Sequence, residues 1–436
     1  MKRKVASSAA KSHSPRPKVS ILLPSRNRQP YFKQLILDMI SNPRRDLEFV
    51  VADNSDDGSI MRAFMETLSD DRIRFLPSLE RPLGMRDNFE RCVANSRGDW
   101  MTMCGDDDYI DPNIPDLLDR ALREKPDLDI ISWSRIYYRW PDNREKDGKI
   151  SISLLDFLGE VPKATLLDEY FMWRHRSLTA AVPFTIFHCL VSRKLMDAIR
   201  TRFGGRFFGH TTVDVDNFCK ILVTANRFMY SARPFSIDGA CRQSNQARAR
   251  GVENYSKLQS EMVKDLGFDP NANGLIRDFP FPSTLGIAAS GAQAIEYFKR
   301  KHGLMIDGWQ ENFAKSCEAD CSAFSLDQAD YEHAVAKYRA AFAAWADGRY
   351  ARFFDPPAQK PVLETSELLG VVDRSLFVPE SIGGVERPKQ LYDFVQWILA
   401  PIDQLVTVPS LSFVARPEQE QDSPNIPDPS LERRFG

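Results

Sequence analysis

Short apolar runs alternate with amphipathic segments through the first third of the chain. The runs have the length and composition of buried strands, and they are Val19–Leu23, Leu47–Val51, Ile73–Leu76, Trp100–Met103 and Ile130–Ser132. Segments with apolar residues at helical spacing lie between them, at Tyr31–Ile40, Met61–Leu68, Arg86–Ala94 and Ile114–Arg123. Because alternating β and α units of this length connect through right-handed crossovers, the pattern predicts an α/β domain with a mostly parallel sheet.

The polar residues that follow these runs predict where a ligand binds. In a parallel sheet flanked by helices, the ligand site lies beyond the carboxyl ends of the strands. Acids, arginines and amides occur together after the first four runs, in Pro24–Arg28, Ala52–Ser59, Glu80–Asn88 and Gly105–Asp108. We therefore expect a polar site at one edge of the sheet.

Beyond residue 140 the pattern changes. Phe184–Ile199 reads as a strand followed by a helix, Asp214 opens another amphipathic helix, and Pro234–Ile237 reads as a last strand. From Pro282 onwards the chain is Ala-rich with helical spacing. The expected organisation is a disordered basic tail (1–17), an α/β domain (18–250, with halves 18–135 and 136–250), a mainly helical region (251–415) and a second disordered tail (416–436).

Composition narrows the classes of partner. The 436 residues exceed what one core usually supports, and a hydrophobic content of 43% argues against disorder. Lys and Arg number 58 against 60 Asp and Glu, so no net charge recruits nucleic acid. Seven cysteines without a C-x-x-C pair indicate reduced thiols, and Cys317 and Cys321 are spaced like neighbours on a helix. Without a transmembrane segment, we expect a cytoplasmic protein, either free or peripheral to the membrane.

The acidic triplet Asp106–Asp108 is the most informative motif. It follows the apolar run Trp100–Met103 and the glycine at position 105. Because residues i and i+2 of an extended segment project to the same side, Asp106 and Asp108 can share one divalent cation. The alternative is a solvated loop that ends the strand and caps the next helix, which is the commoner use of aspartate in turns.

The order of the strand-end motifs resembles the family 2 glycosyltransferases, which have the nucleotide-sugar-binding fold called GT-A. The motifs that carry this resemblance are Val19–Arg28, Val50–Ser55 with Asp57–Ser59, Gly84–Met85 with Asn88–Glu90, and Gly98–Trp100 leading into Gly105–Asp108. They cover residues 18 to 135, with a looser match to about residue 250. The resemblance implies a GT-A domain with a largely helical C-terminal extension, and an inverting, metal-dependent transferase of the hexosyltransferase type. The Q-x-x-R-W motif of processive membrane synthases is absent, so we expect a non-processive enzyme.

By position, the resemblance implies a donor that is a nucleoside-diphosphate sugar, UDP-linked, and a set of contacts to it. These contacts are Pro24, Ser25, Arg26, Asp53, Arg86, Asn88, Asp106 and Asp107. The carboxylate of Asp53 can accept the imide N–H of uracil, or it can instead cap its own turn. Arg86 precedes a helix and can meet a diphosphate oxygen, or it can pair with a neighbouring acid.

The acidic triplet corresponds to the D-x-D-type metal motif of the family, which implies a bound Mn2+ or Mg2+ ion. Asp106 and Asp108 are the expected ligands, and Asp107 is the alternative. Gly105 stands where the family often has an aspartate, so the register of the ligands stays open.

An inverting transferase also needs a base that takes the proton of the acceptor hydroxyl. The resemblance implies Asp214 or Asp216, with a slight preference for Asp214, although acids at a helix start also stabilise the helix dipole. His188 is either a hydrogen-bonded core histidine or a ligand. Arg242 lies in a loop from which it can reach phosphate or acceptor, or remain solvated.

Two other classes compete with this prediction. A nucleotide-sugar-binding scaffold would keep the fold without catalysis. A nucleotidyltransferase would normally carry a Gly-rich phosphate loop after the first strand, and Pro24–Arg28 contains no glycine. The acceptor, whether carbohydrate, lipid-linked or protein, is not indicated by any motif. The helices after residue 282 are expected to bind the acceptor, to form a homo-oligomer or to lie on a membrane surface.

Overall fold

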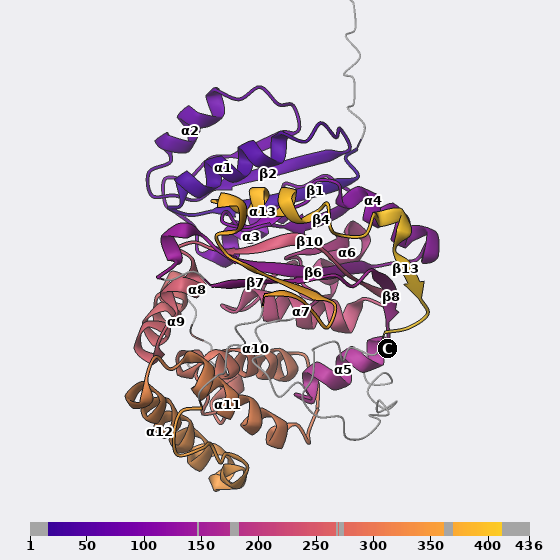
Figure 1. Ribbon diagram of the computed structural model, residues 1–436. Helices are drawn as coiled ribbons and strands as arrows, with labels where there is room; N and C mark the ends of the chain where they lie inside the picture. The colour runs from indigo at the N-terminus through magenta and orange to yellow at the C-terminus, as the bar shows by residue number, and fades with distance from the viewer. Residues whose placement is uncertain are drawn as a thin grey trace, which may run out of the picture.

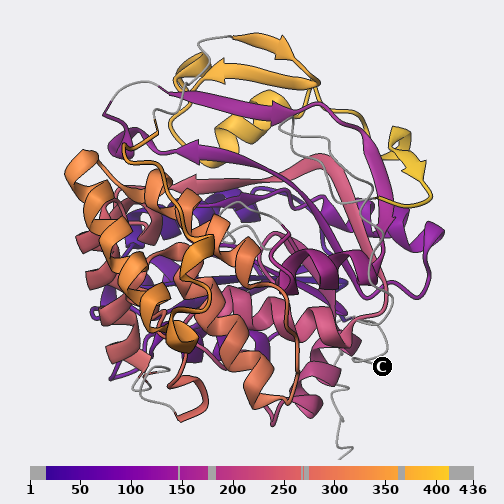
Figure 2. The same ribbon diagram turned by 90° about the horizontal axis from the view of Figure 1, so that it is seen from below.

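The computed structural model describes residues 16–145, 148–174, 183–266, 269, 274–361 and 369–411. A large central sheet carries helices on both faces, and a layer of helices from the second half of the chain lies below it (Figure 1). Seen from below, a small second sheet stands at the opposite side of the molecule from these helices (Figure 2). The predicted tail at 1–17 falls almost entirely outside the described residues, and the tail at 416–436 falls wholly outside them.

The first half of the chain forms the parallel part of the sheet. Strand β1 (Val19–Ser25) is buried throughout and pairs in parallel with β2 (Leu47–Asp53) and β4 (Trp100–Met103), and β3 (Ile73–Leu76) pairs in parallel with β2. Strands covered on both faces are apolar along their whole length, which is why the sequence predicts these strands. The intervening helices are α1 (Gln29–Ile40), α2 (Ser59–Glu66), α3 (Met85–Ala94) and α4 (Ile114–Glu124).

The second half completes the sheet in the order β13-β8-β10-β6-β9-β4-β1-β2-β3. Strand β9 (Cys189–Ser192) runs antiparallel between β4 and β6 (Ile130–Arg139). The long β10 (Phe228–Ala240) pairs in parallel with β6, and β5 (Tyr109–Ile110) pairs with β10. The predicted fold class, a mostly parallel sheet flanked by helices with a helical C-terminal region, is confirmed.

Several short strands were not predicted. β7 (Lys149–Ser153) pairs with β12 (Ser375–Pro379), and β12 pairs with β11 (Gly370–Val372), which gives the small three-stranded sheet. β13 (Val406–Val408) adds in parallel to β8 (Phe157–Val161) at the edge of the large sheet. The C-terminal region therefore contributes strands as well as helices, and it returns to the first domain.

The remaining helices pack in two places. α5 (Lys163–Phe171), α6 (Arg193–Arg202) and α7 (Val213–Thr224) belong to the sheet domain, and α13 (Pro388–Val395) packs against β10 and β5 on the opposite face. The lower layer consists of α8 (Asn245–Arg248), α9 (Val252–Leu266), α10 (Ile287–Lys301), α11 (Gln310–Phe324) and α12 (Gln328–Ala344). One apolar core runs from α7 through α10 to α12, so this layer is continuous with the sheet domain. None of the described helices is long and apolar enough to cross a membrane.

Candidate active site

A large cleft opens at the edge of the sheet where the parallel strands end. Its volume is about 1430 Å3, and α9 and the start of α10 form one wall. Eight of the predicted site residues line it: Pro24, Ser25, Arg26, Asn88, Asp108, His188, Asp214 and Arg242. The cleft thus collects residues from the loop after β1, from α3, from the loop after β4 and from the start of α7, as the strand-end argument predicts.

Two carboxylates of the acidic triplet are held by an arginine. Arg28 lies 3.0 Å from Asp106 through Nη2 and 3.1 Å from Asp107 through Nη1. The Ser25 hydroxyl also donates to Asp106 at 2.6 Å, and the Cys241 N–H donates to Asp107 at 3.1 Å. Burial raises the pKa of Asp107 to about 7, although Arg28 lowers it. Asp106 and Asp107 are therefore engaged within the protein rather than directed at the cleft.

Asp108, the third carboxylate, lies in a different environment. It accepts the Gly239 N–H at 2.7 Å and the Gly105 N–H at 3.0 Å, and its Oδ2 lies 3.4 Å from His188 Nε2. Burial would raise the pKa of Asp108, but His188 and the two N–H groups lower it. Asp108 therefore favours its ionised form.

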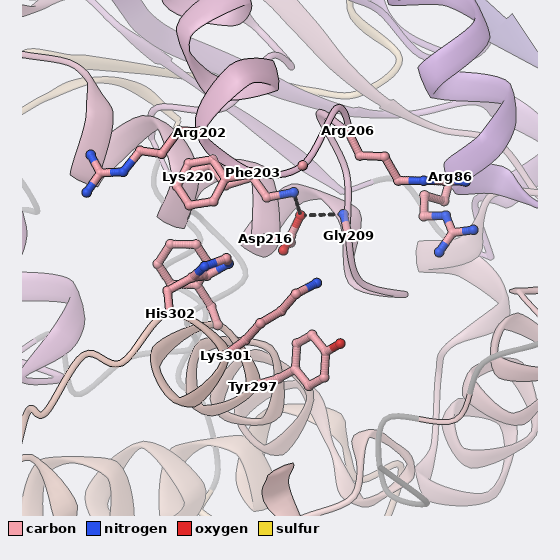
Figure 3. A pocket seen from close by; sticks show the side chains of 12 residues that line it. Arg86, Arg202, Phe203, Arg206, Gly209, Asp216, Lys220, Tyr297, Lys301 and His302 are labelled. Carbon is pink, nitrogen blue, oxygen red and sulfur yellow. Dashed lines mark hydrogen bonds and ion pairs between the residues drawn. The ribbon is translucent and has the colours of Figure 1, made fainter. Parts of the chain in front are cut away.

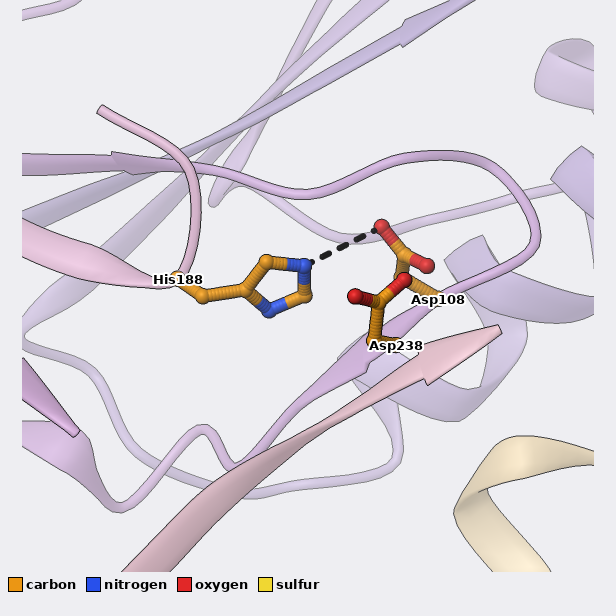
Figure 4. A group of neighbouring side chains, drawn as sticks. All are labelled: Asp108, His188 and Asp238. Carbon is orange, nitrogen blue, oxygen red and sulfur yellow. Dashed lines mark ion pairs between the residues drawn. The ribbon is translucent and has the colours of Figure 1, made fainter. Parts of the chain in front are cut away.

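His188 and Asp238 complete a cluster with Asp108 (Figure 4). One ligand atom from each of the three residues lies within 4.8 Å of the others. His188 has a left-handed backbone conformation with φ 52°, and its Nδ1 lies 2.9 Å from the Ser236 hydroxyl, which fixes the direction of the ring. Two carboxylates and an oriented imidazole are a suitable ligand set for a divalent metal ion.

Two glycines allow the backbone to approach this cluster. A Cβ atom at position 239 would lie 1.8 Å from the carbonyl oxygen of Asp107, so only glycine permits β10 to pass there. A Cβ atom at Gly105 would lie 2.7 Å from Oδ2 of Asp108. The departure from the family pattern at Gly105 therefore has a structural reason, since a larger residue would disturb the turn that holds Asp108.

The two candidate bases lie in different cavities. Asp214 is half-buried in the wall of the large cleft, and burial raises its pKa. Asp216 is almost fully buried, pairs with Lys220 at 2.7 Å and accepts the Gly209 N–H at 2.6 Å. Asp216 lines a second, smaller cavity (Figure 3). Of the two, Asp214 is the one in the cavity that contains Asp108.

The other predicted nucleotide contacts are distributed unevenly. Oδ1 of Asp53 accepts the Ser55 N–H at 3.1 Å, while its buried Oδ2 has no hydrogen-bond partner among the described residues. Asp53 itself is fully buried and does not line the cleft. Arg86 pairs with Asp87 at 3.0 Å and lines the smaller cavity. Arg26 pairs with Asp265 of α9 at 2.9 Å, which ties the loop after β1 to the cleft wall.

Three residues of the site were not predicted to act in it. Arg28 was expected only as part of the strand end Pro24–Arg28. No role was predicted for Asp238 or for Arg135, which lies 3.5 Å from Asp238. A signal was present for Asp238, because an acid followed by glycine at the end of a strand matches the pattern at the other strand ends.

Comparison with known proteins finds a family match in the first part of the chain. Residues 20–197 match the family model described as Glycosyl transferase family 2. No curated protein matches the sequence. Among solved structures, Staphylococcus aureus TarS (residues 1–349, in complex with UDP-GlcNAc) is 14% identical with a TM-score of 0.42 and covers 77% of this chain and 89% of its own. The mannosyltransferase PcManGT from Pyrobaculum calidifontis, in complex with GDP-Man and Mn2+, is 18% identical with a TM-score of 0.35 and covers 78% and 85%. Likeness at this level transfers no residue roles.

Proposed function

We propose that the chain, in which residues 20–197 match the Glycosyl transferase family 2 model, is an inverting, metal-dependent transferase that moves a sugar from a UDP-sugar to an acceptor hydroxyl. The observation that carries this proposal is that Asp108, His188 and Asp214 line the same cleft. A group that holds the leaving diphosphate and a base for the acceptor are the two requirements of the reaction.

The residues that would hold the metal ion are Asp108, His188 and Asp238. When bound, the ion neutralises the charge that develops on the departing diphosphate. The sequence alone favoured Asp106 with Asp108, but the pairing of Asp106 and Asp107 with Arg28 supports the cluster around His188 instead. An imidazole in the ligand set favours Mn2+ over Mg2+, because Mg2+ prefers oxygen ligands and retains its waters.

Asp214 would serve as the base. Its carboxylate takes the proton of the acceptor hydroxyl as the acceptor oxygen forms a bond to the anomeric carbon of the donor. The bond from that carbon to the diphosphate breaks on the opposite face, and the nucleoside diphosphate leaves, so the configuration inverts. The raised pKa of Asp214 makes the carboxylate a better proton acceptor than a solvated aspartate.

We assign recognition of the nucleobase to Asp53. Its Oδ1 is occupied by the Ser55 N–H, which leaves Oδ2 for one further donor. Uracil offers a single imide N–H, whereas guanine offers two neighbouring donors that suit both oxygens of a carboxylate. A buried oxygen without a partner is costly, and a nucleobase would relieve that cost. Because a Cβ atom at Gly58 would lie 3.6 Å from this oxygen, nucleotide binding would require the loop of Gly58 to move.

The test is release of nucleoside diphosphate from a panel of UDP-, GDP- and dTDP-sugars, with Mn2+, Mg2+ or EDTA. We expect slow release from a UDP-sugar even with water as acceptor, dependence on metal, and loss of release in Asp108→Asn. The matched control is Asp119→Asn, which changes a half-exposed aspartate on α4. Metal-dependent UDP binding without turnover of any donor would contradict catalysis and favour a scaffold.

A further inference from the structure

The large cleft has room for a second ligand beside the donor. Its volume of about 1430 Å3 exceeds the range of about 300–1,000 Å3 that is usual for a single small-molecule site. The proposed donor contacts come from the strand ends, whereas α8, α9 and the start of α10 form the other wall. These helices lie beyond the matched residues 20–197, and α9 packs against α3 and α12 (Figure 1). This wall is therefore where an acceptor would lie.

One face of α9 borders the cleft. Tyr255, Leu258, Gln259 and Met262 line it, and they recur at the spacing i, i+3, i+4 and i+7 of a single helix face. Tyr255 and Leu258 are each 5% exposed and Gln259 is 8% exposed, so this face is well covered within the molecule. The wall thus consists of an ordered helix face rather than a loop.

The proposed base lies near the Tyr255 end of this face. The Ser290 hydroxyl on α10 lies 3.1 Å from the hydroxyl of Thr212, the residue that precedes α7 and its Asp214. Burial raises the pKa of Tyr255, a side-chain hydrogen bond with Ser290 opposes the rise, and the charge of Asp214 adds to it. Residues four apart on a helix are neighbours at roughly 6 Å, so Gln259 follows Tyr255 directly. An acceptor whose hydroxyl meets Asp214 would therefore extend along α9 toward Gln259.

Carboxamide side chains are the main uncharged polar groups of this wall. Those that line it are Gln243, Asn245, Gln246 and Gln259. In the part of the chain that the structure describes, none of these side chains makes a hydrogen bond, although a side chain as buried as Gln259 normally has a partner. A carboxamide both donates and accepts, as a sugar hydroxyl does. The wall therefore suits a ligand with several hydroxyl groups.

The charged groups of the cleft do not favour an anionic acceptor. Six cationic and five acidic side chains line it, so neither sign is in clear excess. Two ion pairs neutralise four of these groups on the α9 side: Arg248 with Glu261 at 2.6 Å, and Arg26 with Asp265 at 2.9 Å. Arg242 and Lys264 have no ion pair among the described residues, but both are exposed and they belong to separate elements. An uncharged acceptor fits this balance.

From these observations we propose that the wall formed by α8 and α9 binds a neutral saccharide as the acceptor, with Gln259 as its principal polar contact. Gln246 on α8 is the second contact, and the apolar side chains of Leu258 and Met262 would pack against the C–H groups of a sugar ring. The role as acceptor rests on the transferase proposed above, whereas the binding of a saccharide does not.

Saturation-transfer NMR on the full chain without donor tests the site. The probes are the neutral sugars methyl glucoside, methyl mannoside, N-acetylglucosamine, lactose and cellobiose, the anionic sugars glucuronate and glucose 6-phosphate, and a blocked Ser-Gly peptide. We expect a neutral sugar to bind, and its affinity to fall about tenfold in Gln259→Leu and measurably in Gln246→Leu, because amide hydrogen bonds are lost. Asn254→Leu is the matched control, since this α9 amide donates to the carbonyl oxygen of Arg250 and lies outside the cleft lining.

Transfer kinetics then test the role as acceptor. With an active UDP-sugar, the bound saccharide should accelerate UDP release, and Gln259→Leu should raise the KM for the saccharide more than it lowers kcat. Saccharide binding without turnover of any donor would refute the transferase and keep the site. Donor turnover with no binding of a neutral sugar would refute this inference and keep the transferase. The inference is also overturned if both leucine variants on the wall bind as well as Asn254→Leu, or if the anionic sugars or the peptide bind more tightly.

Discussion

Asp214 and Asp216 lie two residues apart at the start of α7 and face different cavities. Successive helical residues are turned by about 100°, so residues i and i+2 point to nearly opposite sides of the helix. Asp214 faces the cleft that Asp108 also lines, and Asp216 is bound to Lys220. The start of α7 therefore carries one acid that faces the cleft and another that is held in a buried ion pair.

Replacing Asp214 by Asn should remove the base while keeping the shape of the side chain. We expect kcat to fall by about 10²- to 10⁴-fold, the usual contribution of general-base catalysis. UDP affinity should remain close to that of the wild type, because Asp214 does not hold the donor. Steady-state kinetics with a working donor and acceptor, together with calorimetric UDP binding, check both statements. An enzyme that keeps full kcat would exclude Asp214 as the base.

The pH dependence of the transfer should follow the carboxyl group of Asp214. A base acts in its deprotonated form, and burial raises its pKa above the ordinary value of 3.8. Activity should therefore decrease as the pH falls through that raised value, and this acidic limb should lie higher than for a solvated aspartate. A profile of kcat/KM against pH measures it. An acidic limb that persists unchanged in the residual activity of Asp214→Asn would belong to another group.

Replacing Asp216 by Asn should mainly affect stability. The substitution leaves the ammonium of Lys220 buried without its charged partner, and removal of one member of a buried pair costs about 3–5 kcal/mol. Urea unfolding at pH 7 measures the loss. The double variant Asp216→Asn with Lys220→Met removes both charges and should regain part of it. If Asp216→Asn instead abolished activity in a stable protein, the roles of the two acids would be exchanged.

Replacing His188 by Ala should weaken metal binding. We expect the affinity for Mn2+, measured by the loss of free-ion EPR signal without nucleotide, to fall about tenfold or more. Asp238→Asn should weaken it as well. Asp106→Asn discriminates between the two ligand sets, because it should disturb the pair with Arg28 and leave Mn2+ affinity nearly unchanged. A large effect of Asp106→Asn with none of Asp238→Asn would restore the pair expected from the sequence.

Glu48 offers a test of stability at acid pH away from the site. Burial would raise its pKa, but hydrogen bonds from the Ser20 hydroxyl and from Arg97 leave it below the ordinary value of 4.5. A lowered folded-state pKa gives stability that is present above the unfolded value and is lost as the pH falls through the folded value. Glu48→Gln should cost about 1–3 kcal/mol at pH 7 and less below pH 4.5. An equal cost at both pH values would show that the charge of Glu48 contributes nothing.

Much of the sheet was predictable because its strands are buried on both faces. Val19–Leu23 and Leu47–Val51 are apolar without interruption, and each ends at residues whose polarity marks the edge of the sheet. The small strands β11, β12 and β13 were missed because they are short and partly exposed, so that neither alternation nor a continuous apolar run identifies them.

The sequence predicted which residues gather in the candidate site, but not which of them pair with one another. Strand ends converge in any parallel sheet, so Asp108 and the loop after β1 were expected to lie together. Arg28 pairs with Asp106 and Asp107 because of the path that its long side chain follows. Asp238 approaches Asp108 because β10 passes close to the acidic triplet at Gly239. Neither is encoded in local periodicity.

The pairing of β7 with β12 has a consequence for the order of folding. Lys149–Ser153 leaves the ribosome long before Ser375–Pro379, and until then this edge of β7 has no neighbour. Contacts between such distant segments close late and slow the last step of folding. An unpaired edge is also a place where another chain can add. The nascent first half of this protein should therefore depend on chaperones until its final strands arrive.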